Sequence, residues 1–136
     1  MRVLGLDIGK KRIGVAVSDE TRVIAQNLTF IKNISDKAVI AEIKALVTEY
    51  DVSRIVIGLP LYLDGSEGDM ADFVRDMGGK IGTATGIEVI MWDERFTTKC
   101  AVAVLISAGV SRKKRKILKD KVAAQLILQE YLESAA

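Results

Sequence analysis

The sequence contains no histidine and only one cysteine among its 136 residues. Without histidine the chain has no imidazole general base, no Ser-His catalytic pair and no His-ligated zinc site. A single cysteine cannot close an internal disulfide or supply a thiolate cage for a metal. Acid–base or metal chemistry in this chain therefore depends on carboxylates.

Aromatic residues make up only 5% of the chain, which argues against a nucleic-acid platform built from rows of Phe and Tyr. The sequence also lacks an apolar run of the roughly 18 residues that a membrane span requires. Met1 and Arg2 lead directly into a strand-like segment rather than into a signal peptide. We therefore expect a cytoplasmic protein with no membrane partner.

Basic residues are concentrated near the C-terminus, although the formal net charge is only +2. Such a run forms either a solvated surface or a patch that binds a polyanion such as nucleic acid. The basic run comprises Arg112, Lys113, Lys114, Arg115, Lys116, Lys119 and Lys121.

Hydrophobic periodicity and capping residues predict the element order βββαβαβαα within one domain, residues 1–136. No internal repeat, low-complexity segment or long linker interrupts this order. The predicted strands cover Val3–Ile8, Arg12–Ser18, Val23–Ile31, Arg54–Leu59 and Ile87–Trp92. The predicted helices follow Ser35 as far as Tyr50 and then cover Asp69–Thr83, the segment from Thr97 or Thr98 to Ser107, and Leu118–Leu132.

The first two strands are joined by the short turn Gly9-Lys10-Lys11 and predict a β-hairpin. The strand Arg54–Leu59 is reached through a helix, so it should pair in parallel with a central strand through a right-handed crossover. An α/β fold with a mixed sheet follows from these two connections.

Two carboxylates occupy positions that should otherwise be apolar. Asp7 ends an apolar strand on the same face as Val3 and Gly5, and ionised carboxylates are costly to bury without a partner. Asp120 shares a predicted helix face with Ala124 and residues that should pack on the sheet. Asp7 could instead accept hydrogen bonds from its turn, and Asp120 could favour the helix dipole or pair with Lys116.

Asp93 and Glu94 follow the last predicted strand. Together with Asp7 and Asp120 they place carboxylates after a first strand, after a last strand and at the start of a last helix. Such a set suits a hard divalent cation bound by oxygen, typically magnesium, which also bridges to phosphate oxygens.

Basic side chains flank these carboxylates. Lys10, Lys11 and Arg12 lie in the predicted hairpin beside Asp7, and the basic run lies beside Asp120. This arrangement is typical of a polyanion held over a metal site, in which phosphate contacts supply affinity without reading sequence.

Four segments of the chain resemble the signature blocks of the YqgF (RuvX-like) nuclease family, in the same order and over nearly the whole chain. The resemblance implies a ribonuclease H-like fold, with a five-stranded mixed β-sheet whose first three strands are antiparallel and with helices on both faces. It also implies a nuclease that trims the 5′ end of pre-16S ribosomal RNA. The four segments are Leu4–Ala16, Ile57–Leu61, Asp93–Thr98 and Asp120–Ala124.

By this resemblance Asp7, Glu94 and Asp120 are the catalytic residues and hold one or two magnesium ions, or manganese in their place. Asp7 would bridge both ions, and no side-chain base would be needed. Arg95, Thr97 and Thr98 would position the phosphate. In RuvC-like relatives a glutamate closes the fourth strand, whereas this chain reads Gly58-Leu59-Pro60 there. Glu94 is therefore our choice for the second ligand, with Asp93 and Glu67 as alternatives.

Other functions remain open at this stage. A Holliday junction resolvase would use the same acidic site on branched DNA, and it would need a symmetric dimer. RNA is favoured as the substrate because no extra dimerisation element is evident, which suits a monomer or a weak homodimer. A non-catalytic nucleic-acid-binding module would keep only the basic patch. The Gly-rich hairpin also resembles the phosphate loop of sugar kinases and Hsp70 ATPases, but those enzymes close two such domains over the nucleotide.

Two further residues have predicted structural roles. Cys100 lies among apolar residues of a predicted helix and is interpreted as a small core residue rather than a redox site. Trp92 ends a strand and is expected to pack rather than to stack on a base.

Overall fold

The computed structural model describes residues 1–62, 64–93, 109 and 111–135, with the backbone alone at 112, 113 and 115–121. Its five-stranded sheet has the order β3-β2-β1-β4-β5. β1 pairs with β2 and β2 with β3 in antiparallel fashion, whereas β4 runs parallel to both β1 and β5. The strands are β1 (Arg2–Ile8), β2 (Arg12–Ser18), β3 (Ala25–Lys32), β4 (Val52–Leu59) and β5 (Glu88–Asp93).

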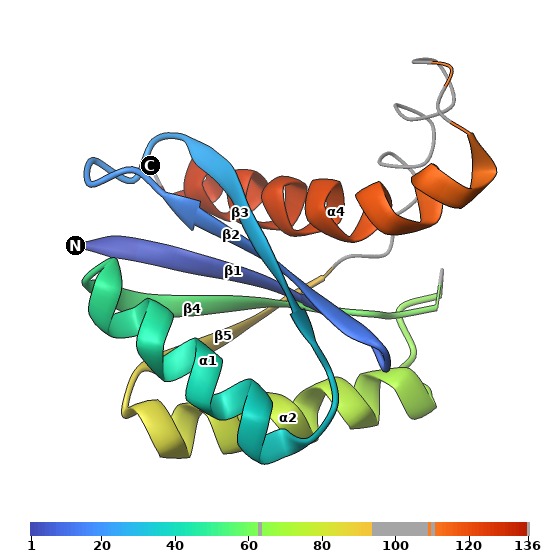
Figure 1. Cartoon of the computed structure of the whole chain (residues 1–136), viewed down its shortest axis with the longest axis horizontal. Coiled ribbons are helices and arrows are strands. Elements are labelled where there is room, and N and C mark those ends of the chain that lie inside the picture. The colour runs from blue at the N-terminus through green and yellow to red at the C-terminus, as the bar shows by residue number, and fades with distance from the viewer. Residues whose placement is uncertain (63, 94–108, 110, 136) are drawn as a thin grey trace.

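Helices cover both faces of the sheet (Figure 1). α1 (Asp36–Glu49) and α2 (Asp69–Thr85) lie along one face, and α4 (Arg112–Ala135) crosses the other. Alternation along β1 separates two cores, because successive side chains of a strand point to opposite faces. Leu4, Leu6 and Ile8 belong to the core beneath α1 and α2, whereas Val3 belongs to the core beneath α4. The predicted mixed sheet with helices on both faces is confirmed.

α4 lies directly against β1 because residue 5 has no side chain. A Cβ atom at Gly5 would lie 2.7 Å from Leu128 Cβ and 3.3 Å from the Ala124 carbonyl oxygen. Ala123 and Ala124 are fully buried, and their small side chains let this turn of α4 approach the sheet. Farther along the helix, Tyr131 lines a cavity together with Val3. α4 therefore runs antiparallel to β1, with its early turns nearest the carboxyl end of that strand.

Cap residues define one end of α1 and one end of α2. The Ser35 hydroxyl accepts a hydrogen bond from the Ala38 N–H at 3.2 Å and caps α1. Gly86, with φ 70°, ends α2 in the left-handed conformation that glycine favours. Among the described helices, none is both long and apolar enough to cross a membrane.

Several predicted boundaries were wrong: β4 begins at Val52 rather than Arg54, α2 ends at Thr85 rather than Thr83, and α4 ends at Ala135 rather than Leu132. β3 begins at Ala25 rather than Val23, because the Asp19 carboxylate accepts hydrogen bonds from the Val23 and Ile24 N–H groups and holds them in a turn. α4 begins at Arg112 rather than Leu118. The Ser111 hydroxyl accepts a hydrogen bond from the Lys114 N–H at 3.3 Å and so caps the helix before the basic run. The basic run therefore lies inside α4. The predicted helix ending at Ser107 lies outside the described residues.

Candidate functional site

Asp7 lies near the end of β1 and is half-buried. It pairs in register with Gly14 on β2, and it follows the Gly5 contact with α4 by two residues. Alternation along the strand therefore points the Asp7 side chain toward α4, about 7 Å beyond Gly5. Asp120 precedes Ala124 by one turn of α4, which moves the helix backbone about 6 Å in the same direction. The structure thus brings the positions of Asp7 and Asp120 to one edge of the sheet.

The β1–β2 turn carries the predicted basic residues. Lys10 and Lys11 are exposed, and the guanidinium of Arg12 lies 6.0 Å from the centre of the Phe30 ring. Asn33 fixes this turn: its side-chain amide donates to the Gly9 carbonyl oxygen and its backbone N–H to the Lys11 carbonyl oxygen, both at 3.0 Å. Sequence analysis missed Asn33, whose only signal was its place directly after a strand at the same edge.

β5 delivers its last residues to the same edge, because it is parallel to β4 and pairs Asp93 with Leu59. Trp92 packs toward α4, as predicted: its indole N–H donates to a Glu130 carboxylate oxygen at 3.1 Å, and its ring makes a T-shaped contact with Tyr131 at 5.7 Å. Asp93 follows Trp92 by one residue, so its side chain points to the opposite face from α4. This geometry disfavours Asp93 as a partner of Asp7.

Glu67 is also disfavoured as a ligand. Its two carboxylate oxygens accept hydrogen bonds from the Arg75 guanidinium at 2.6 and 3.0 Å. This bidentate pair lowers the pKa of the Glu67 carboxyl below its usual value. The pair anchors the loop after β4 to α2.

Several predicted site residues lie outside the described residues. These are Glu94, Arg95, Thr97 and Thr98, and Cys100 lies there too. The backbone of Arg112, Lys113, Lys114, Arg115 and Lys116 forms the first turns of α4, and Lys114 is exposed. Within the part of the chain that the structure describes, no three acidic, Cys or His residues are grouped so as to hold a metal ion.

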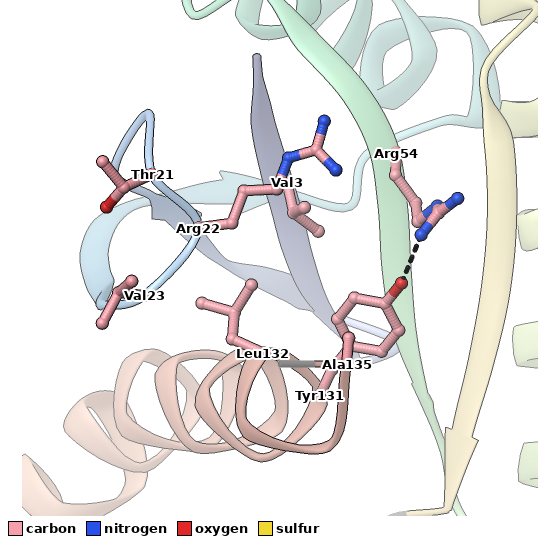
Figure 2. A pocket seen from close by; sticks show the side chains of 8 residues that line it. All are labelled: Val3, Thr21, Arg22, Val23, Arg54, Tyr131, Leu132 and Ala135. Carbon is pink, nitrogen blue, oxygen red and sulfur yellow. Dashed lines mark hydrogen bonds between the residues drawn. The ribbon is translucent and has the colours of Figure 1, made fainter.

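A cavity of about 300 Å³ lies at the other end of β1 (Figure 2), lined by Val3, Arg22, Arg54, Tyr131 and neighbouring residues. Arg54 donates a hydrogen bond to the Tyr131 hydroxyl at 2.7 Å. The cavity adjoins the C-terminal turns of α4, where cationic side chains offset the negative end of the helix dipole. The cavity lies at the amino end of β1, whereas Asp7 lies near the carboxyl end.

The chain matches the family model described as "RuvX: Holliday junction resolvase" over residues 1–134. It belongs to the RuvX family. It is 48% identical over 134 residues to a protein of Syntrophus aciditrophicus, covering 98% of this chain and 89% of that one. It is 47% identical over 135 residues to a protein of Thermoanaerobacter pseudethanolicus, covering 98% and 97%. Each of these relatives is named as a proposed pre-16S rRNA nuclease.

Solved structures with the same fold include resolvases. T. thermophilus RuvC in complex with a Holliday junction substrate matches with a TM-score of 0.63 and 17% identity, covering 99% of this chain and 96% of that one. The fowlpox virus resolvase matches with a TM-score of 0.59 and 18% identity, covering 99% of both chains. The predicted family and the predicted ribonuclease H-like fold are confirmed.

Proposed function

We propose that this RuvX-family chain is a nuclease that hydrolyses phosphodiester bonds at the edge where β1, β4 and β5 end. The observation that carries the proposal is the place of Asp7. Its half-buried carboxylate points toward α4. Asp7 lies two residues beyond Gly5, which contacts Leu128, and is level with the turn of α4 that carries Asp120. A carboxylate kept there at the cost of burial indicates a positive partner.

We propose Asp7, Glu94 and Asp120 as the residues that hold one or two magnesium ions, or manganese in their place. The donor chemistry fits, because the chain has no histidine and its candidate ligands are all carboxylates, which hard divalent cations prefer. When bound, the cation would supply an activated water and neutralise charge on the phosphodiester. Glu94 is retained as the second ligand because the Glu67 carboxylate is hydrogen-bonded to Arg75 and the Asp93 side chain points away from α4.

The basic residues of the chain would hold the polyanion. Lys10 and Lys11 are exposed in the turn that follows β1, within four residues of Asp7. The first turns of α4 contain five consecutive basic residues and no acidic one, so their charge opposes the positive end of the helix dipole. Phosphate groups bound at this end of the helix would relieve that repulsion. Arg12, Arg95, Thr97 and Thr98 complete the proposed contacts.

We propose the 5′ end of pre-16S ribosomal RNA as the substrate, acted on in the cytoplasm by a monomer or weak homodimer. The names of relatives at 43–48% identity over 98% of the chain support this substrate. The family description and the RuvC fold favour a second candidate, cleavage of four-way DNA junctions.

Parallel cleavage assays test these proposals. A labelled RNA that spans the pre-16S 5′ end and a four-way DNA junction are incubated with the chain in magnesium or in EDTA. Magnesium-dependent cutting of the RNA at a defined position supports the proposal. Symmetric paired nicks in the junction would move the function to resolution of DNA. Binding without cleavage of either polymer would contradict the nuclease proposal.

A further inference from the structure

Tyr62 is the aromatic side chain most open to solvent among the residues that the structure describes, with 63% of its surface exposed. It lies in the loop that follows β4, at the carboxyl edge of the sheet. The other described Phe, Tyr and Trp side chains are half-buried or buried. A Tyr ring combines a large apolar surface with a polar hydroxyl, so an exposed Tyr can stack on a ligand.

The loop holds Tyr62 in place through its own hydrogen bonds. The Tyr62 N–H donates to the Ser66 carbonyl oxygen at 2.9 Å, and the Gly65 N–H donates to the Tyr62 carbonyl oxygen at 2.8 Å. One Asp64 carboxylate oxygen accepts from the Ser66 N–H at 2.8 Å and from its hydroxyl at 2.6 Å. The Glu67–Arg75 pair adds a further anchor at the end of this segment.

The ring itself is seated on Gly68, the residue before α2. A Cβ atom at that position would lie 2.6 Å from the Tyr62 hydroxyl oxygen and 2.8 Å from Cε2. The ring therefore contacts the glycine backbone on one side and presents the rest of its surface to solvent. This contact fixes its orientation before any ligand binds, which reduces the entropic cost of stacking.

The loop is close to the proposed catalytic edge. Leu6 pairs with Ile57 in the parallel register, so Asp7 is level with Gly58. Gly58 and Tyr62 are separated by at most about 14 Å of extended backbone. Figure 1 shows the loop after β4 and the β1–β2 turn at the same end of the sheet. A strand whose phosphate lies at Asp7 therefore reaches Tyr62 within a few nucleotides.

The charges around Tyr62 favour a base over a phosphate. Asp69 and Asp72 occupy the first turn of α2, which begins directly after Gly68, and their carboxylates would repel a phosphate bound there. The carboxylates of Asp64 and Glu67 are engaged by Ser66 and Arg75. Of the parts of a nucleotide, the neutral nucleobase is therefore the one that can lie against the ring.

We infer that Tyr62 stacks on an unpaired nucleobase of the substrate strand near the scissile phosphate and so positions that strand. The inference deepens the proposed function and rests on it. Stacking on one aromatic ring tolerates any base, so Tyr62 favours single-stranded over fully paired substrate without selecting sequence.

The test compares binding of single-stranded RNA by the wild type, Tyr62→Ala, Tyr62→Phe and Val23→Ala, by fluorescence anisotropy in EDTA. We expect Tyr62→Ala to weaken binding about tenfold and Tyr62→Phe to keep wild-type affinity. Val23, 60% exposed at the opposite end of the sheet, is the control for loss of an exposed apolar side chain. Thermal melts check that each variant is folded.

A second arm replaces the RNA with a fully abasic strand of the same length. The wild type should bind the abasic strand more weakly than the RNA, and Tyr62→Ala should show a smaller difference between the two strands. Equal affinity of wild type and Tyr62→Ala for both strands would overturn the inference. This test measures binding, so its failure is distinguishable from failure of the proposed function. The proposed function fails if the wild type does not cut RNA and Asp7→Asn changes nothing.

Discussion

Gly5 on β1 lies against Leu128 on α4 so closely that a Cβ atom at residue 5 would sit 2.7 Å from the Leu128 Cβ atom. This contact sets how near α4 comes to β1, and hence the separation of the Asp7 and Asp120 positions. In the proposed function, this close approach of α4 to β1 is what allows Asp120 and Asp7 to contribute to one site.

Gly5→Ala should therefore separate α4 from the sheet. We expect a loss of about 1–3 kcal/mol in the free energy of unfolding, because the added methyl overpacks a filled core. Nuclease activity should fall by more than the loss of folded protein explains. Gly79→Ala is the matched control: a Cβ there meets nothing within 4 Å, and alanine in a helix interior should stabilise the chain by about 0.5–1 kcal/mol. Chemical denaturation measures the free energy of unfolding of both variants. A Gly5→Ala variant as stable as the wild type would refute the role given to the Gly5–Leu128 contact.

Glu67→Gln tests whether Glu67 supports the loop or belongs to the site. The Arg75 hydrogen bonds lower the pKa of Glu67 in the folded state, so the pair stabilises the fold above the unfolded pKa of a glutamate. That contribution is lost as the pH falls through the lower, folded pKa. Wild type should melt higher than Glu67→Gln at pH 7, and the two melting temperatures should converge in acid. Cleavage should persist in the variant, and its abolition would make Glu67 a site residue.

Trp92→Phe tests how β5 is fixed to α4. Phenylalanine keeps an aromatic ring beside Tyr131 but removes the indole N–H that donates to Glu130. We expect a loss of about 1 kcal/mol in the free energy of unfolding. Glu130→Ala should cost less in the Trp92→Phe background than in the wild type, and denaturation of all four proteins completes the cycle. Strictly additive losses would mean that the hydrogen bond contributes nothing.

Asn33→Asp tests the turn that carries Lys10 and Lys11. A carboxylate cannot donate to the Gly9 carbonyl oxygen and would bring a negative charge beside the two lysines. We expect RNA affinity to fall several-fold, and more steeply at low salt than at high salt. Asn27→Asp, on the exposed part of β3, adds the same charge away from the turn and serves as the control. Equal effects of the two variants would show that charge alone, not the turn, is responsible.

Sequence patterns predicted the parts of this fold that depend on local chemistry. Alternation along β1 placed Asp7 on the face of Gly5, and Ser35 marked the start of α1 correctly. The start of α4 was missed because five basic residues at a helix N-terminus oppose the helix dipole, so local electrostatics argue against the helix that forms. Burial of the apolar residues in the later turns of α4, from Ala123 to Leu132, offsets that cost.

The candidate site was predicted in part. Asp7 and Asp120 stood out as carboxylates on apolar faces, a signal contained in the sequence itself. The roles of Asn33, Tyr62 and Arg75 depend on contacts between elements, including Arg75 with Glu67 and Tyr62 with Gly68. Single-residue patterns carry no record of such contacts, so these residues emerged only from the structure.

The measurement that tests the central claim most directly is magnesium-dependent RNA cleavage by the wild type, Asp7→Asn, Asp120→Asn and the double variant. If the two carboxylates act as one unit, each single variant should lose at least about 100-fold in rate and the double variant should be no worse than either. Asp93→Asn, which alters a carboxylate on the opposite face, should cleave normally. Wild-type cleavage by Asp7→Asn, or multiplying losses in the double variant, would contradict a shared site at this edge.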